Sequence, residues 1–307
     1  MNAITIGIFD GIHAGHRRLI HQTVKRRPAA GQAVMLTFPY PPEYYFNPRE
    51  FEGLLYLTEE KEKRARALGM DRVEILDFPT LKDMTPSEFV DHILCPLNPA
   101  WVIVGYNFRF GRHRAGTTDF LRAYGKKKGF QTTVVPPVFV NGVKVSSTII
   151  RYFLKSGEIA KANAFLNQPY LLEGSFAEAP DTGVLSALFS LRFLRKGSGF
   201  VPLYPGYYLA RNRHLGYAIL CISYKGTSSE NPRFSLHPLG FDRDPPRRVE
   251  GISTKSSYDT QASYDTQASY DTQASYDWIL LKYLSSRIDQ TILGAIRGQG
   301  MTKTRSR

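Results

Sequence analysis

The sequence predicts an α/β protein in two parts: a parallel β-sheet with helices on both faces, followed by a small antiparallel β-domain. Three observations lead to this expectation. Through the first half, short apolar runs rich in β-branched residues alternate with helix-like segments, a pattern typical of parallel sheets. After about residue 170, short strand-like runs alternate with turns rich in Gly, Pro, Ser and Asn. The length of 307 residues is enough for two domains, which we expect to span residues 1–168 and 169–307.

The segments between the apolar runs of the first half carry the start and stop signals of helices. One opens with Thr85, Pro86 and Glu88, and two others end in Gly69 and Gly129. The apolar runs fit strands that are covered on both faces, and ligands of such sheets bind beyond the carboxyl ends of the strands. The expected strands are residues 3–9, 32–38, 72–76, 101–105 and 132–137, and the expected helices are residues 13–27, 58–69, 85–94 and 117–129.

The second half is predicted to form strands until close to its end. Residues 257–277 repeat SYDTQA three times and begin a fourth copy, and without an apolar stripe they are expected to form a surface loop expanded by tandem duplication. Residues 278–296, WILLKYLSSRIDQTILGAI, are predicted to form a helix ahead of a basic tail. The expected strands are residues 186–194, 204–212, 215–223 and 233–241.

Composition excludes several classes of protein. Hydrophobic residues make up 42% of the chain, the mean hydropathy is −0.28, and no apolar run reaches the roughly 18 residues of a membrane-spanning helix, so no membrane partner is expected. The first residues lack the basic and long apolar regions of a secretory signal peptide. Cys95 and Cys221 are too few and too far apart for a disulfide framework or a cysteine metal site, which favours a reducing cytoplasm.

The positive charge of the chain is concentrated in two places. Of the formal net charge of +13, residues 1–172 carry +8, residues 173–281 carry zero and residues 282–307 carry +5. Such a balance suits nucleic acid, an acidic membrane surface or a phosphorylated substrate. Its position in the first half favours a nucleotide and a phosphorylated small molecule, and only the tail leaves a nucleic-acid contact open. The sequence carries no signal for an oligomeric state.

Residues 7–16, GIFDGIHAGH, form the first of three stretches suited to phosphate. The three glycines let the backbone approach a ligand closely, and free N–H groups at the following helix start favour an anion. The stretch is neither the P-loop nor the dinucleotide-binding glycine pattern. It places His13 and His16 three residues apart, where two imidazoles can donate hydrogen bonds to one phosphate and offset its charge in a transition state. The alternative is a solvated or metal-binding histidine pair, for which no third ligand of suitable spacing is evident.

The other two stretches combine cations with aromatic rings or hydroxyl groups. In residues 102–116, VIVGYNFRFGRHRAG, arginines stand beside Phe108 and Phe110, so guanidinium groups for phosphate adjoin rings that can pack on a planar ligand. The alternative is that the phenylalanines belong to the core and the arginines to a solvated rim. Residues 145–151, VSSTIIR, open a helix whose hydroxyls, amides and Arg151 suit polyphosphate oxygens, although an ordinary helix N-cap explains the same pattern.

In this order and spacing, the three stretches resemble the bacterial bifunctional riboflavin kinase/FMN adenylyltransferases, or FAD synthetases. The resemblance covers residues 1 to about 172, including PYLLEGSF where the family's kinase domain begins. The HxGH and SSTxxR motifs are those of the nucleotidyltransferase superfamily, and the FRFG loop points to its flavin branch. The resemblance implies a Rossmann-like nucleotidyltransferase domain followed by a riboflavin-kinase-like barrel. It also implies transfer of AMP from ATP to FMN, with Mg²⁺ expected on the phosphates.

The resemblance assigns roles to individual residues. His13, His16 and Arg151 are expected to be catalytic and to bind ATP, and no residue is expected to form a dedicated metal site. The further expected ATP contacts are Gly7, Phe9, Asp10, Gly15, Ser147 and Thr148, and the expected flavin or phosphate contacts are Phe38, Asn107, Phe108 and Arg109.

The chain departs from the family pattern in two places. The family usually has TFxPHP after the second strand, whereas residues 37–42 read TFPYPP and lack the histidine. The second domain departs further, because residues 174–193 contain no counterpart of the kinase's GxPTAN loop and Ser235 stands at the expected position of its catalytic glutamate. A serine is not a general base at neutral pH. We therefore expect a degenerate kinase domain without riboflavin kinase activity.

Two other functions fit part of the pattern. Another adenylyl- or cytidylyltransferase of a small substrate would use the same phosphate-binding groups. A nucleotide- or flavin-binding regulator, or an RNA binder, would keep the site without turnover, and the altered second domain and basic tail are the reasons to consider it. Because a binding module needs neither His13 nor His16, the enzyme is the preferred interpretation.

Overall fold

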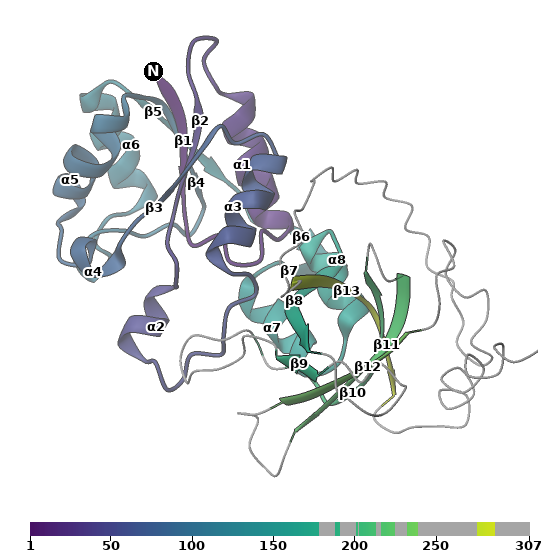
Figure 1. The fold of residues 1–307 in the computed structure, drawn as a ribbon. Helices are drawn as coiled ribbons and strands as arrows, with labels where there is room; N and C mark the ends of the chain where they lie inside the picture. Colours follow the sequence, from purple (N-terminus) through teal and green to yellow (C-terminus); the bar gives the residue numbers. More distant parts are fainter. Residues whose placement is uncertain are drawn as a thin grey trace, which may run out of the picture. The chain divides into compact units, whose positions relative to one another are not determined.

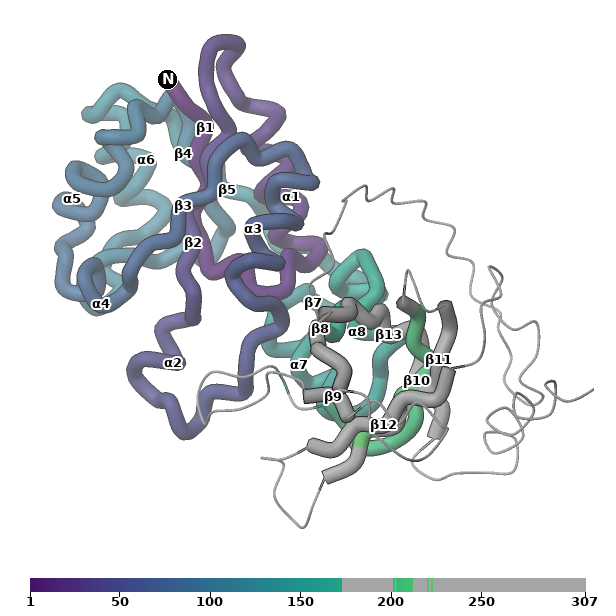
Figure 2. The backbone as a smooth tube through the Cα atoms, in the orientation of Figure 1, coloured from purple at the N-terminus to yellow at the C-terminus, as the bar shows by residue number. Residues whose placement is uncertain are grey.

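The computed structural model describes residues 1–177, 188–190, 201, 203–212, 216–224, 232–238 and 275–285. The chain divides into two compact units, and Figure 2 traces both in the order of the sequence. The first unit contains Met1–Arg151 and Ala164–Asn167, and the second contains Tyr152–Asn163 and Gln168–Arg307.

Five parallel strands form the central sheet of the first unit, in the order β3-β2-β1-β4-β5 (Figure 1). All five strands predicted from the sequence are confirmed, although β1 ends at Ile6, so that the glycine-rich stretch lies beyond the sheet. The strand order reverses direction between β1 and β4, the place where open parallel sheets bind their ligands. The strands are β1 (Asn2–Ile6), β2 (Ala33–Thr37), β3 (Arg72–Ile75), β4 (Pro99–Gly105) and β5 (Gln131–Val135).

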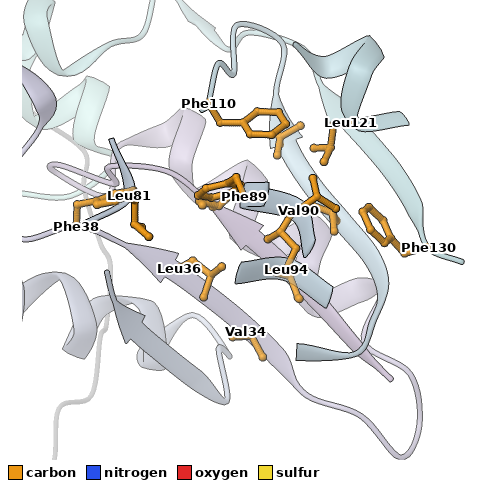
Figure 3. Close-up of a cluster of buried hydrophobic side chains, with 14 residues drawn as sticks. Val34, Leu36, Phe38, Leu81, Phe89, Val90, Leu94, Phe110, Leu121 and Phe130 are labelled. Carbon is orange, nitrogen blue, oxygen red and sulfur yellow. The ribbon is translucent and has the colours of Figure 1, made fainter. Parts of the chain in front are cut away.

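Helices cover both faces of this sheet, with α1 and α3 on one side and α4, α5 and α6 on the other (Figure 1). Alternate residues of each buried strand point to opposite faces, as along β2, where Val34 and Leu36 enter one core and Ala33 and Met35 the other. Figure 3 shows the first of these cores. The helices are α1 (Ala14–Lys25), α3 (Thr58–Ala67), α4 (Phe78–Leu81), α5 (Pro86–Phe89) and α6 (Thr118–Lys128).

The predicted helix over residues 85–94 changes its geometry partway. It begins as expected, since Thr85 accepts a hydrogen bond from the backbone N–H of Glu88 while the Glu88 carboxylate accepts from the N–H of Thr85. Four residues later the helix widens into a π-helical turn, Val90–Leu94, and then tightens into a 3₁₀ turn, Cys95–Leu97. Wide turns of this kind are short insertions in an otherwise α-helical path.

Several short elements escape the sequence patterns because they contain too few residues to show a period. They are α2 (Pro42–Phe46), the hairpin of β6 (Phe139–Val140) with β7 (Val143–Lys144), and α8 (Ile159–Leu166). The helix start expected in residues 145–151 is confirmed as α7 (Ser147–Lys155). Within the described ranges, every helix is too short or too polar to cross a membrane.

The second unit contains a six-stranded antiparallel sheet in the order β12-β11-β10-β13-β8-β9. The sheet curls, so that Cα atoms of its two edge strands, β9 and β12, lie within 8 Å of one another. Each of the four strand-like runs of the second half contains a strand of this sheet, although residues 186–187, 191–194, 215 and 239–241 of these runs lie outside the described residues. The six strands are β8 (Tyr170–Ala177), β9 (Leu188–Ser190), β10 (Gly206–Asn212), β11 (Gly216–Tyr224), β12 (Pro232–Pro238) and β13 (Ser275–Ser285).

The helix predicted for residues 278–296 is wrong over its first eight residues, which belong to strand β13. The run is rich in leucine, which favours helices, but β13 lies between β10 and β8, and both neighbours bond to its backbone. Residues 286–296 lie outside the described residues. The loop expected over the repeat is also wrong at its end, because Ser275–Asp277 begin β13, and residues 257–274 are not described.

Candidate functional site

The loop between β1 and α1 holds its backbone in a strained conformation. Phe9 and Ile12 have φ angles of 52° and 41°, in the left-handed region that residues other than glycine rarely adopt, and Gly11 between them has a φ of 88°. Both side chains are fully buried and belong to the core beneath α1 and α3. Each such residue costs of order 1–3 kcal/mol and persists where the surrounding packing enforces it, commonly at functional sites.

His13 and His16 lie together at the start of α1. His13 is the N-cap residue, and its Nδ1 accepts a hydrogen bond from the backbone N–H of His16 at 3.3 Å. The two imidazole rings stack, with their centroids 3.6 Å apart and their planes 12° apart. Gly15 makes room for this stack, since a Cβ atom there would lie 3.1 Å from the His13 ring. The sequence prediction that the two histidines share one helical turn is confirmed.

Both imidazoles are neutral at neutral pH. Burial lowers the pKa of His13 to about 4. Burial, the neighbouring His13 and the cation of Lys61 all lower the pKa of His16, which lies well below its ordinary value of 6.5. Because the Nδ1 of His13 accepts a hydrogen bond, the proton of its neutral ring is on Nε2, where it can be donated. The pair therefore offers hydrogen bonds to an anion and no positive charge of its own.

His16 has an unused polar atom. Its Nδ1 is buried, and no group of the described residues lies within hydrogen-bond distance of it. Buried polar atoms normally have a partner, and those that do not occur at functional sites or where a ligand supplies the bond. The Phe9 ring also packs against His16, with ring centroids 5.1 Å and planes 56° apart. One side of the histidine pair is thus shaped by an apolar ring.

Asp10 belongs to the loop between β1 and α1, and it connects this loop to two other segments of the chain. Its Oδ1 accepts hydrogen bonds from the backbone N–H groups of Leu55 (2.9 Å) and Tyr56 (3.2 Å). Its Oδ2 pairs with Arg151, and its main-chain oxygen accepts a hydrogen bond from the Ser147 hydroxyl at 2.9 Å. Burial raises the pKa of the Asp10 carboxyl, while Arg151, Lys61 and the two N–H groups act in the opposite direction. The carboxylate therefore anchors the loop to the segment around Leu55 and to Arg151.

The start of α7 meets the same loop. Ser146 caps the helix by accepting a hydrogen bond from the backbone N–H of Ile149 at 3.3 Å. Arg151 pairs with Asp10 and donates from Nε to the carbonyl oxygen of Gly53 at 2.8 Å. Thr148 is exposed, so its hydroxyl is accessible to a ligand. The structure thus brings the first and third phosphate-type stretches together through Asp10, Ser147 and Arg151.

The second stretch, at the carboxyl end of β4, divides between core and surface. Phe110 is buried in the core with Phe89, and Phe108 stacks on it with ring centroids 5.4 Å apart. Phe110 and Gly116 exchange two backbone hydrogen bonds, which close the loop. The phenylalanines therefore serve packing, although Phe108 keeps some exposed surface. The polar residues of the loop face solvent: Asn107, Arg109, Arg112 and Arg114.

An aromatic cluster follows the carboxyl end of β2. Phe38 itself is buried in the core and meets Phe78 edge to face, with ring centroids 6.1 Å apart. Tyr40 stacks on Tyr44 at 4.1 Å, and Tyr45 stacks on Phe78 at 5.2 Å. Phe46 is 63% exposed, an unusual position for a large apolar ring. We call Tyr40, Tyr44, Tyr45, Phe46, Phe51 and Phe78 the aromatic cluster.

Sequence reasoning missed Lys61, a lysine that is fully buried in α3. Its ammonium donates hydrogen bonds to the carbonyl oxygens of Phe38 (2.6 Å) and Pro39 (3.2 Å). The surrounding segment reads TEEKEKRARALG and has the composition of a solvent-exposed helix. The one sequence signal for burial is weak, namely the position of Lys61 four residues before Ala65, which is also buried.

The described residues form no cluster of three or more His, Cys, Asp or Glu side chains that could hold a metal ion. Asp10, the carboxylate nearest the histidines in the sequence, already uses both oxygens in bonds to Arg151 and to backbone N–H groups. The residues at this site therefore do not fit a protein cage for Mg²⁺, which prefers carboxylate and phosphate oxygens.

Comparisons with known proteins identify relatives of this chain. The family model of FAD synthetase matches residues 1–149. A bifunctional riboflavin kinase/FMN adenylyltransferase of Listeria monocytogenes is 29% identical over 251 residues, which cover 78% of this chain and 79% of the relative. A putative bifunctional riboflavin kinase/FMN adenylyltransferase of Geobacillus thermodenitrificans is 32% identical over 55% of this chain and 90% of its own length.

A solved structure resembles the whole chain. The crystal structure of a protein described as a macrolide-efflux protein from Streptococcus pneumoniae has a TM-score of 0.72 and covers 99% of this chain and 95% of its own. At 19% identity this likeness concerns the fold alone. An FAD synthetase of Listeria monocytogenes is 30% identical over 59% of this chain and 74% of the relative. With the match to the family model, this relative shows that the chain belongs to the FAD synthetase family.

Proposed function

We propose that the first unit transfers AMP from ATP to FMN and so forms FAD and pyrophosphate. An oxygen of the FMN phosphate attacks the α-phosphorus of ATP in line, a new P–O bond forms, and the bond to the β-phosphate breaks. The attacking oxygen is already anionic and needs no general base, so the protein contributes positioning and stabilisation of the charge that develops. The catalytic roles of His13, His16 and Arg151 are part of this proposal.

The observation that carries the proposal is the stacked pair of neutral histidines at the carboxyl end of β1. His13 donates from Nε2, and His16 has a buried ring nitrogen without a partner in the described part of the chain. His13 caps α1 and His16 lies in its first turn, where free backbone N–H groups add to the attraction for an anion. A phosphate that gains charge in the transition state is stabilised most by donors already fixed in place.

The triphosphate of ATP is proposed to extend from this pair to the start of α7. Thr148 is exposed there, and Arg151 is held by Asp10 with its guanidinium next to the loop. Gly7 and Gly15 keep space in the loop: a Cβ atom on Gly7 would lie 3.3 Å from the Phe9 ring. In this proposal Asp10, Ser147 and Phe9 shape the ATP site by holding the loop, since their polar atoms or rings face protein groups.

The flavin is proposed to bind beside the aromatic cluster. An isoalloxazine ring gains affinity by stacking on aromatic faces. The aromatic cluster, in which Phe46 is exposed and the other rings are half-buried, provides such faces without the histidine that the family usually has there. Phe38 supports the cluster from the core through Phe78. Exposed Asn107 and Arg109, with the edge of Phe108, are proposed to meet the FMN phosphate.

Mg²⁺ is proposed to arrive with the nucleotide. Magnesium commonly keeps several waters and binds substrate phosphates with few protein ligands, which agrees with a site whose described residues offer no carboxylate cage. The proposal assigns no residue of this chain to the ion.

We infer that residues 169–307 form a degenerate riboflavin-kinase-like domain that does not phosphorylate riboflavin. The backbone of Ser235 lies on β12 opposite Cys221 of β11, so the position expected for a catalytic base is inside a strand and carries a serine. The segment where the kinase's nucleotide loop is expected lies mostly outside the described residues. The support for this inference is therefore the sequence at these two places.

A product assay tests the proposal. Purified full-length protein is incubated with ATP and Mg²⁺ and with FMN, nicotinamide mononucleotide or phosphopantetheine in separate reactions, and products are separated by chromatography alongside a pyrophosphate assay. Of the three acceptors, we expect only FMN to react, giving FAD and pyrophosphate. Pyrophosphate from another acceptor would assign a different transferase, and no pyrophosphate with any of them would indicate a binding protein. Riboflavin with ATP is expected to give no FMN, and formation of FMN would overturn the inference of an inactive kinase.

A further inference from the structure

Lys61 is buried at a cost that its surroundings only partly offset. Its side chain has no exposed surface, and burial lowers its pKa to about 8, against the opposing effects of Asp10 and Glu59. A buried ammonium is unfavourable unless its charge and its hydrogen bonds are matched. Here two of its three protons meet main-chain carbonyl oxygens, at Phe38 and Pro39. The lysine therefore fixes a backbone segment.

The segment that Lys61 holds is the exit from β2 toward the aromatic cluster. β2 ends at Thr37, whose hydroxyl donates to the carbonyl oxygen of Ile8 at 3.0 Å and so joins this exit to the β1 loop. Phe38 inserts its ring into the core, and Pro39 precedes Tyr40, the first ring of the cluster. The two carbonyl bonds of Lys61 thus set the direction in which the chain leaves the sheet.

The same ammonium also interacts electrostatically with groups of the loop between β1 and α1. The carboxylate of Asp10 raises the pKa of Lys61, and the charge of Lys61 contributes to lowering the pKa of His16. A geometric link runs alongside these electrostatic effects. Lys61 bonds to the carbonyl groups of Phe38 and Pro39, and Thr37, just before them, donates to Ile8 in the loop that carries the histidine pair.

We propose that Lys61 is a positioning residue that sets the aromatic cluster relative to the His13–His16 pair and thereby controls binding of the acceptor, while ATP binding does not depend on it. This inference rests on the proposed function for the identity of the acceptor. Lys61 has no exposed surface, so its proposed effect on the acceptor is indirect. It acts through the carbonyl groups of Phe38 and Pro39.

The test compares Lys61→Met, Lys61→Arg and the control Lys63→Met in the full-length protein. Lys63 lies on the same helix, with a side chain that is 54% exposed. Steady-state formation of FAD gives KM for FMN and for ATP separately. The Kd of FMN is measured by fluorescence titration and the Kd of ATP by isothermal titration calorimetry, both without turnover. Lys61→Met leaves two buried carbonyl groups without their donor, so we expect KM and Kd for FMN to rise about tenfold or more and those for ATP to change less than about twofold.

The remaining variants separate positioning from general loss of structure. Lys61→Arg keeps the charge and several donors, and it should recover most of the FMN affinity, whereas Lys63→Met should match the wild type. Equal losses for FMN and ATP, or a lower melting temperature with unchanged KM values, would overturn the proposal. If Lys61→Met does not fold, Lys61→Gln, which keeps an N–H donor without charge, decides by the same comparison of FMN with ATP.

The design distinguishes this inference from the proposed function. If the wild type and Lys63→Met form no FAD, the proposed function fails. The FMN and ATP binding titrations of the Lys61 variants then still test the positioning role of Lys61. If they form FAD and Lys61→Met retains wild-type KM for FMN, the function stands and the positioning role of Lys61 is refuted.

Discussion

The imidazole rings of His13 and His16 stack with 3.6 Å between their centroids, and the Nδ1 of His13 accepts the backbone N–H of His16. This arrangement links three properties of the site. The hydrogen bond fixes the tautomer of His13, the stack fixes the direction of both rings, and burial keeps both neutral. Donors that are fixed before the ligand arrives need no reorganisation in the transition state, the condition under which they are most effective.

Removing either imidazole should reduce turnover while the fold persists. We expect His13→Ala and His16→Ala to lower kcat for FAD formation about 10²–10³-fold, since each removes one donor to the transferring phosphate. His13→Asn keeps a side-chain acceptor for the helix cap and separates loss of the cap from loss of the imidazole. His21→Ala is the control, because His21 is exposed on the same helix. Circular dichroism confirms the fold, and near wild-type turnover of the His13 and His16 variants would refute the assignment.

The depressed pKa of His13 predicts that stability falls in mild acid. The pKa of His13 is about 4 in the folded state and 6.5 for the free side chain. Between pH 4 and pH 6.5, His13 therefore binds a proton in the unfolded state but not in the folded state. Stability from this residue is therefore complete above pH 6.5 and is lost as the pH falls toward 4. A shift of this size corresponds to about 3 kcal/mol, and His16 acts in the same direction.

The pH effect can be measured with one of the two tryptophans. Trp101 lies on β4 of the first unit, and Trp278→Phe removes the other. Urea unfolding is followed by Trp101 fluorescence at pH 7 and at pH 5. Between these two pH values the free energy of unfolding should fall less in His13→Asn than in the Trp278→Phe protein that carries His13. An equal loss in both proteins would show that His13 titrates normally.

Gly15→Ala should separate activity from stability. The added Cβ atom would lie 3.1 Å from Cε1 and 3.3 Å from Nδ1 of His13, so the ring must move out of the stack by a few tenths of an ångström. Alanine favours a helix over glycine by about 1 kcal/mol, which offsets the strain in the folded state. We expect kcat to fall about tenfold, because a small misplacement of a catalytic group is costly, with a melting temperature near that of the wild type. Unchanged kcat would mean that the stack tolerates displacement.

The parts of the site that sequence analysis found are those with local signals. The five strands of the first unit follow from apolar runs of five to seven residues, and the shared position of His13 and His16 follows from helical spacing alone. The start of α7 follows from its hydroxyl residues in the same way. Each of these features depends on residues that are neighbours along the chain.

The parts that it missed depend on packing between distant segments. The partners of Asp10 are 45, 46 and 141 residues away in the sequence, so its role as a connector has no local pattern. Lys61 lies in a segment with the composition of a surface helix and is buried because α3 packs beside the end of β2. Strand β13 was predicted as a helix because leucine-rich runs suit both structures, and pairing on both sides decided between them.

The buried pair of Asp10 and Arg151 should contribute far more to stability than an exposed pair. Asp10→Asn leaves a guanidinium that is 11% exposed without its carboxylate, and loss of one partner of a buried pair costs about 3–5 kcal/mol. Asp71→Asn is the matched control: its pair with Arg27 has side chains 40% and 34% exposed, and exposed pairs contribute about 0–1 kcal/mol. Unfolding followed by Trp101 fluorescence should therefore show a large loss for Asp10→Asn and a small one for Asp71→Asn. A double-mutant cycle with Arg151→Met tests the cause, because the loss belongs to the pair only if the second substitution adds much less than its own single effect.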